Sequence, residues 1–226
     1  TWRTDIRLTL PSVMRLTFAP WLDDYVGQHI LGLRWTIVLY PAVLAILWFA
    51  RHYNSSSSFR VWLEGAVVHV LALFVTTETS YMLVGHYPQF FNLSFNEAAL
   101  LAMNWLLLAG VYLWRAKKAV NAPRLYRLFA AALITGAGVL HLDVSLFNNP
   151  FLQQVLTGDG IVINWLLVLW ALPALILLKL YQMGLIVARF QAAIKLVTGA
   201  LIFMYINGVI RGAYHSGQLV LNGYMP

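Results

Sequence analysis

One carboxylate lies inside an apolar stretch among hydroxyl side chains. Thr76 and Thr77 precede Glu78, and Thr79 and Ser80 follow it, within a run long enough to cross a membrane. A carboxylate in the hydrocarbon layer is costly and commonly marks a proton, cation or substrate site. The same group can instead be structural, when hydrogen bonds to it tie two helices together. At the level of the sequence both interpretations of Glu78 stay open.

Another polar group ends a later apolar stretch. His141 and Asp143 lie there, followed by a polar loop, and with Glu78 they could line a cavity on one side of a membrane. Capping and loop structure are the alternative roles for them. The spacing His-x-Asp offers two ligands, whereas zinc sites use three or four protein ligands, so we predict no metal and no cofactor.

Two adjacent carboxylates, Asp23 and Asp24, come just before the first apolar stretch. Their position is similar to that of the acidic residues in the first outer loop of polyprenyl-phosphate-dependent glycosyltransferases. A solvated pair of loop residues is the alternative interpretation. We keep both residues as candidate functional residues.

Other polar residues inside the apolar stretches are predicted to be structural. Glu64 precedes Glu78 by fourteen residues, or ~21 Å along a helix, so the two carboxylates cannot form one acid–base pair. Because Glu64 follows Arg60 by four residues, we expect an ion pair on the helix surface. His69 is expected to make a hydrogen bond in helix packing. Amides that could link helices are Asn104, Asn164 and Asn207.

The composition places these residues in a membrane. Of the 226 residues, 61% are hydrophobic and 10% charged, and the mean hydropathy is +0.72, which is more apolar than a soluble domain can bury. A spanning helix needs roughly 20 apolar residues. We therefore predict an all-α, polytopic transmembrane bundle of about six spanning helices with short loops, near 33–50, 61–84, 95–114, 125–142, 161–181 and 196–210.

Three regions follow from this division. Charges interrupt 1–32, which we predict to be an interfacial or extramembrane amphipathic segment. The six-helix transmembrane domain covers 33–211. The remaining 212–226 is expected to be a tail on the outer side or the start of a further segment.

Local signals refine the helices. Ser94 and Glu97 match a capping box, which predicts a helix start at 95. Pro173 lacks a backbone N–H and is expected to kink the fifth helix. Gly136, with Gly138 beside it, is expected to let another helix approach closely.

The basic residues predict an orientation. Lys and Arg total 15 and Asp and Glu 8, which gives a net charge of +7. The loops 51–60, 115–124 and 182–195 carry basic residues, whereas 85–94 and 143–160 contain none. The positive-inside rule therefore makes the first three loops cytoplasmic and the other two outer loops. Helix-end topology and anionic lipids explain this charge, so no nucleic-acid partner is predicted.

The absence of cysteine from the sequence excludes a disulfide framework, a thiolate metal site and a cysteine nucleophile.

Several short motifs carry a family resemblance. The motifs are Glu78-Thr79-Ser80-Tyr81-Met82-Leu83, Asn149-Pro150, Gly158-Asp159-Gly160, Asn164-Trp165-Leu166-Leu167, Leu172-Pro173-Ala174-Leu175 and Ile210-Arg211. They resemble the succession of motifs in a large bacterial membrane-protein family, domain of unknown function 2339.

The resemblance implies a multi-pass protein of the bacterial inner membrane. Members of that family are much longer, so it also implies that this chain is one piece of a longer protein. The family has no established activity, and the resemblance assigns no catalytic residue.

We expect a scaffold or assembly component of the cell envelope rather than an enzyme, because the polar residues are dispersed along separate helices. Its expected partners are membrane lipids and proteins in the membrane, or the remainder of a longer chain. The alternative is a transporter or a membrane-embedded lipid- or glycan-processing enzyme. Its candidate residues are Glu78, His141, Asp143, Asp23 and Asp24.

Overall fold

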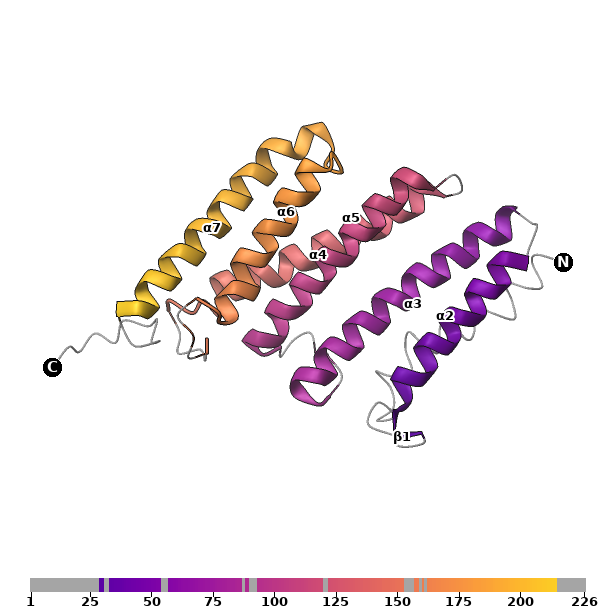
Figure 1. Cartoon of the computed structure of the whole chain (residues 1–226), viewed down its shortest axis with the longest axis horizontal. Coiled ribbons are helices and arrows are strands. Elements are labelled where there is room, and N and C mark those ends of the chain that lie inside the picture. Colours follow the sequence, from indigo (N-terminus) through magenta and orange to yellow (C-terminus); the bar gives the residue numbers. More distant parts are fainter. Residues whose placement is uncertain are drawn as a thin grey trace. The chain divides into compact units, whose positions relative to one another are not determined.

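Helices make up almost all of the part of the chain that the structure describes (Figure 1). The computed structural model describes residues 29–30, 33–53, 57–86, 88–89, 93–119, 122–152, 157–158, 160 and 162–214. The helices in it are α2 (Trp35–Tyr53), α3 (Ser57–Val84), α4 (Phe95–Lys118), α5 (Pro123–Leu146), α6 (Leu172–Gln182) and α7 (Gln191–Tyr214). A π-helical turn, η2 (Leu167–Ala171), precedes α6, and a 3-10 turn, η3 (Ala188–Phe190), precedes α7. The predicted all-α class is confirmed.

A two-residue antiparallel ladder leads into the first of these helices. Strand β1 (His29–Ile30) pairs with β2 (Leu33–Arg34), and His29 lies opposite Arg34. Because α2 begins at the next residue, the ladder places Arg34 directly at the start of that helix.

Five of the described helices are long and apolar enough to cross a membrane. They cover Thr36–Tyr53, Phe59–Val84, Phe95–Lys118, Pro123–Leu146 and Ala188–Tyr214. Each contains at least 18 residues, or about 27 Å at the α-helical rise, which is close to the thickness of the hydrocarbon layer.

The predicted fifth span, 161–181, has a different start in the structure. Residues 162–164 form bends, and the apolar helix made of η2 and α6 covers Leu167–Gln182. Its length is about 24 Å, shorter than a typical hydrocarbon layer. The local cause is Asn164, whose side-chain oxygen accepts the backbone N–H of Leu166 at 3.0 Å, an arrangement typical of a turn before a helix.

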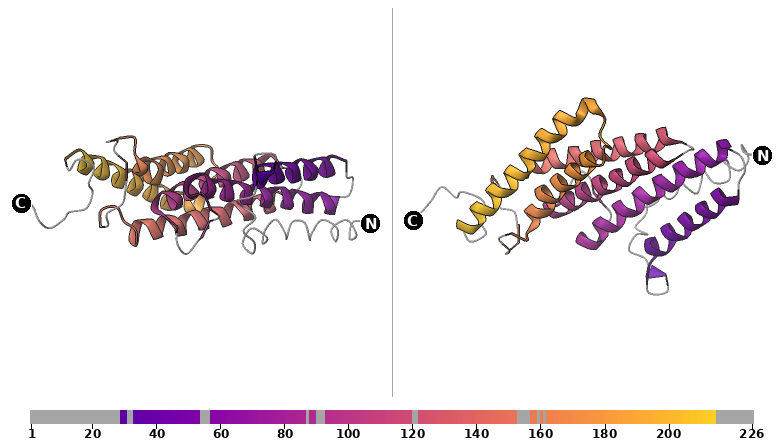
Figure 2. Two further views of the ribbon diagram at one scale, coloured as in Figure 1. Left: turned by 90° about the horizontal axis from the view of Figure 1, so that it is seen from below. Right: turned by 45° about the horizontal axis from the view of Figure 1, so that its top comes forward.

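The described chain divides into two compact units. The first unit comprises Thr1–Asn92 and Tyr112–Ala131. In it α2 and α3 run side by side in all three views (Figures 1 and 2). Apolar residues of both helices form its core: Tyr40, Leu47, Phe59, Leu63, Ala66 and Val70. The hydroxyl of Tyr112 donates to the backbone oxygen of Val68 at 2.7 Å and so joins α4 to this hairpin.

The second unit comprises Leu93–Val111 and Ala132–Pro226. One cluster of buried side chains surrounds Trp170, which is fully buried and stacks on Phe151. Another joins α4, α5 and α6 through Leu101, Ala102, Leu106, Ala137, Leu140 and Leu177.

Two local predictions concern this unit. The oxygen of Ser94 accepts the N–H of Glu97 at 3.3 Å, which confirms the cap at the start of α4. The close approach at Gly136 is also confirmed: a Cβ added there would lie 2.6 Å from the Trp105 ring, whereas one at Gly138 would meet no atom within 4 Å.

Gly136→Ala is expected to destabilise the protein by about 1–3 kcal/mol, because the indole of Trp105 has to move out of a packed helix contact. Gly138→Ala is the matched control, since it adds the same methyl group two residues further along the same helix in open space. Its expected effect is below about 1 kcal/mol. Thermal unfolding in detergent micelles measures both, and equal effects would contradict the packing at Gly136.

Candidate functional site

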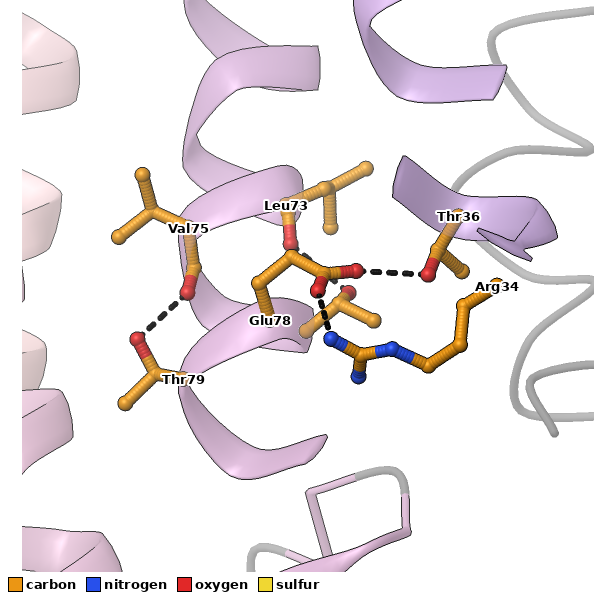
Figure 3. A network of polar contacts seen from close by, with 7 residues as sticks. Arg34, Thr36, Leu73, Val75, Glu78 and Thr79 are labelled. Atoms are coloured by element: carbon orange, nitrogen blue, oxygen red, sulfur yellow. Dashed lines mark hydrogen bonds and ion pairs between the residues drawn. The ribbon is translucent and has the colours of Figure 1, made fainter. Parts of the chain in front are cut away.

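Glu78 receives two short hydrogen bonds from the start of α2 (Figure 3). One carboxylate oxygen lies 2.6 Å from a guanidinium nitrogen of Arg34, and the other accepts the hydroxyl of Thr36 at 2.6 Å. The side chains of Arg34 and Glu78 are 15% and 13% exposed, and Thr36 is fully buried. The guanidinium also lies over the ring of Tyr81, 4.3 Å from its centre. Residues before and within α2 thus neutralise the carboxylate and orient it.

The threonines beside Glu78 bond to their own helix. The hydroxyls of Thr76, Thr77 and Thr79 each donate to the backbone oxygen four residues earlier, at 2.7–2.8 Å. A hydroxyl has one proton to donate, so these three protons go to the backbone of α3. Thr36, on the neighbouring helix, is the hydroxyl that donates to Glu78.

A second Arg–Glu pair holds the other end of the same helix hairpin. The carboxylate of Glu64, 3% exposed, lies 2.9 Å from a guanidinium nitrogen of Arg51 near the end of α2. The sequence had suggested Arg60, on the same helix, as its partner. The structure instead makes Glu64 a link between α2 and α3, which explains how a carboxylate can be buried at this depth.

The electrostatics of the two pairs follow from their surroundings. Removing a charge from water is costly, and an opposite charge at hydrogen-bond distance offsets that cost where the dielectric is low. The carboxylate of Glu78 also lies at the first turn of α2, where the positive end of the helix dipole stabilises an anion. The two Arg–Glu pairs thus link α2, and the residue before it, to α3.

His141 bonds to a backbone carbonyl oxygen whose usual α-helical donor is missing, because a proline stands at the donor position. Its ring nitrogen Nε2 lies 2.5 Å from the oxygen of Leu169. In an α-helix that oxygen would accept the N–H four residues on, but the residue there is Pro173, which has none. The chain forms the π-helical turn η2 at this point, and the N–H of Leu172 donates to the oxygen of Leu167, five residues back. His141 therefore satisfies a backbone group that Pro173 exposes.

Asp143 takes part in the loop that ends α5. Its carboxylate accepts the side-chain N–H of Asn148 at 3.3 Å. Asn149 donates to the oxygen of Ser145 at 2.7 Å and accepts the N–H of Phe151 at 2.8 Å. These local bonds shape the turn. Asp143 and His141 therefore have different partners, although only one residue separates them in the sequence.

The residues predicted to be structural lie as follows. His69 faces the ring of Phe129 edge-on, with 6.3 Å between ring centres. Asn104 is half-buried in α4.

The prediction that Asn164 is a mid-span amide was wrong, because Asn164 lies in the bend before η2 and donates to the oxygen of Gly160 at 2.9 Å. Asn207 donates to the oxygen of Phe203 in its own helix at 2.8 Å, rather than to a neighbouring helix.

Each candidate residue thus has a separate set of partners. Glu78 belongs to the first unit, and His141 and Asp143 belong to the second. Asp23 and Asp24 lie outside the described residues. Within the described part of the chain, no group of three or more His, Asp or Glu side chains could hold one metal ion.

Local sequence patterns do not indicate that Arg34, Thr36 and Arg51 are the partners of the buried carboxylates. The sequence does contain a signal for the pair of Arg34 and Glu78. Arg34 and Glu78 each lie 22 residues from position 56, in the connection between two apolar stretches, so an antiparallel helix pair places them at one depth.

Long apolar helices, carboxylates neutralised by arginines and a histidine-capped carbonyl together define a multi-pass integral membrane protein. The chain belongs to the family described as Predicted membrane protein (DUF2339), whose model matches residues 1–224. Neither the curated proteins nor the solved structures contain a match to the chain.

Arg34→Gln is expected to destabilise the protein by about 3 kcal/mol, because it leaves Glu78 as a largely buried charge without a counter-ion. The double variant Arg34→Gln with Glu78→Gln should recover most of this loss, since both charges are then removed. Chemical unfolding of the single and double variants in micelles measures the coupling. Additive effects would contradict the ion pair.

His141→Leu is expected to lower stability by about 1–3 kcal/mol, because the oxygen of Leu169 is left without a donor. Pro173→Ala supplies a backbone N–H and should therefore rescue much of this loss in the His141→Leu background, provided that the helix regains its α-helical bond. The same unfolding assay applies. If Pro173→Ala destabilises wild type and the His141→Leu variant equally, the stabilising effect of His141 does not come from its hydrogen bond to the oxygen of Leu169.

Proposed function

We propose that this chain acts as a scaffold or assembly component of the cell envelope, in the bacterial inner membrane, with no chemistry of its own in these residues. Its loops 51–60, 115–124 and 182–195 lie on the cytoplasmic side. Its partners are membrane lipids and other membrane proteins, or further parts of a longer chain.

The observation that carries the proposal is the pairing of Glu78. A transporter or an enzyme that used this carboxylate would have to expose it to a substrate, ion or proton. Both carboxylate oxygens are hydrogen-bonded, one to Arg34 and one to Thr36. One carboxylate oxygen of Glu64 is held by Arg51 at 2.9 Å. The role that fits both carboxylates is to hold α2 against α3.

Exposed apolar helix faces give further support. In the most apolar part of the span Ala188–Tyr214, 11% of the residues are buried within the chain, and for Thr36–Tyr53 the share is 17%. Such faces need lipid or other helices around them. A protein that holds partners in a membrane needs surfaces of this kind, whereas a catalyst needs converging polar groups.

Site-specific photo-crosslinking in intact cells tests the proposal. Gln89 and Leu152, both exposed in the loops without basic residues, are the positions for the crosslinker. We expect each to capture a discrete, reproducible protein partner. A crosslinker at Arg124, which is exposed in the first turn of α5 and lies outside both loops, serves as the control for non-specific capture.

The same experiment separates the proposal from the alternative of a transporter or a lipid- or glycan-processing enzyme. Glu78→Gln keeps the size of the side chain and removes its charge. A scaffold that remains inserted should keep its crosslinks in this variant. Failure to recover any partner from Gln89 or Leu152 would contradict the scaffold, and loss of a measurable flux or product in Glu78→Gln would favour the alternative.

A further inference from the structure

A cavity lined by basic side chains opens where three helices of the first unit end or begin. Its volume is about 290 Å³, which is room for on the order of ten water molecules at about 30 Å³ each. The end of α2 supplies Trp48, Arg51 and His52, the first turns of α3 supply Arg60, and the last turns of α4 supply Arg115.

Basic side chains dominate the described lining of this cavity. Three guanidinium groups line it, and one carboxylate, Glu64, is bonded to Arg51 from within the helix pair. Like charges brought together at the edge of a low-dielectric layer repel one another, and a bound anion relieves this repulsion.

Each arginine that lines the cavity carries several N–H donors. Arg51 is fixed by Glu64 at 2.9 Å, and its guanidinium lies 5.5 Å from the centre of the Trp48 ring. A guanidinium has five N–H donors, and a single carboxylate bond uses one of them. Arginine forms paired hydrogen bonds with the oxygens of phosphate, which makes phosphate the anion that suits several converging guanidinium groups best.

The depth of the cavity points to the same chemistry. It lies at the ends of the apolar spans Thr36–Tyr53 and Phe95–Lys118 and at the start of Phe59–Val84, where hydrocarbon gives way to head groups. Trp48 is 60% exposed there, and the ammonium of Lys118 lies 4.2 Å from the centre of the Trp114 ring. Aromatic and basic residues of this kind are typical of the membrane interface.

We propose that this cavity, lined by Arg51, Arg60 and Arg115, binds a phosphate group, carried by an anionic lipid head group or present as free phosphate. The site is independent of the scaffold role, because it needs no protein partner and does not involve Glu78.

The test is ligand-dependent stabilisation of the whole protein in detergent micelles at constant ionic strength. Three compounds are titrated separately: short-chain phosphatidylglycerol, short-chain phosphatidylcholine and inorganic phosphate. The rise in unfolding temperature gives an apparent Kd for each. The variants are Arg60→Gln and Arg115→Gln, each of which removes one cavity guanidinium. The matched control, Arg124→Gln, removes an exposed guanidinium from the first turn of α5, outside the cavity.

We expect wild-type protein to bind phosphatidylglycerol or inorganic phosphate, with roughly tenfold weaker binding in either cavity variant and less than about twofold change in Arg124→Gln. Binding of phosphatidylglycerol alone identifies a lipid head group, and comparable binding of inorganic phosphate identifies the free anion. If one cavity variant fails to fold, the other variant and wild type still decide.

Three results would overturn the proposal. The first is that wild type binds neither anion. The second is that Arg124→Gln weakens binding as much as the cavity variants do, which would indicate general surface charge. The third is equal binding of phosphatidylglycerol and phosphatidylcholine that neither cavity variant weakens, which would indicate contacts with acyl chains.

Discussion

A charge buried in a membrane has to meet an opposite charge, and this constraint organises the first unit of the chain. The antiparallel helices α2 and α3 satisfy it at both ends of their shared interface. Arg34 with Thr36 holds Glu78 at one end, and Arg51 holds Glu64 at the other. Between the two pairs lie apolar core residues that include Tyr40 and Val70. Since the carboxylates are ~21 Å apart along α3, the pairs lie toward opposite faces of the hydrocarbon layer. They fix both the partner and the register of α2, because sliding either helix by one turn would separate both pairs.

The same constraint appears in the second unit with a backbone group in place of a charge. Pro173 leaves the oxygen of Leu169 without its helical donor, and His141 of α5 takes that place. In both units a polar residue within an apolar helix bonds to a neighbouring element of the chain. The basic cavity differs, because three guanidinium groups line one space. Arg51 belongs to both arrangements, so the residue that holds Glu64 also shapes the wall of the proposed phosphate site.

The sequence predicted most of the helices because each spanning stretch is a long apolar run, and hydropathy alone distinguishes such runs from loops. It also predicted the start of α4 from Ser94 and the close approach at Gly136, since both depend on residue types at fixed local spacing. It did not predict the late start of the fifth helix, because Asn164 forms a turn inside an otherwise apolar stretch. The partner of Glu64 was also missed, because a local i, i+4 rule favoured Arg60 over an arginine on another helix. Contacts between helices depend on how the helices are rotated about their axes, which the local pattern does not determine.

Solid-state NMR of the protein in lipid bilayers can detect the ion pair between Arg34 and Glu78. The quantity to measure is the dipolar coupling between the guanidinium nitrogens of Arg34 and the side-chain carboxyl carbon of Glu78. A nitrogen–oxygen distance of 2.6 Å places that carbon within about 4 Å of the nearest nitrogen. An ion pair between Arg34 and Glu78 gives strong coupling and the chemical shift of an ionised carboxylate. Absence of the coupling, together with the chemical shift of a protonated carboxyl group, would contradict the ion pair. Glu78 would then be available for proton or substrate chemistry.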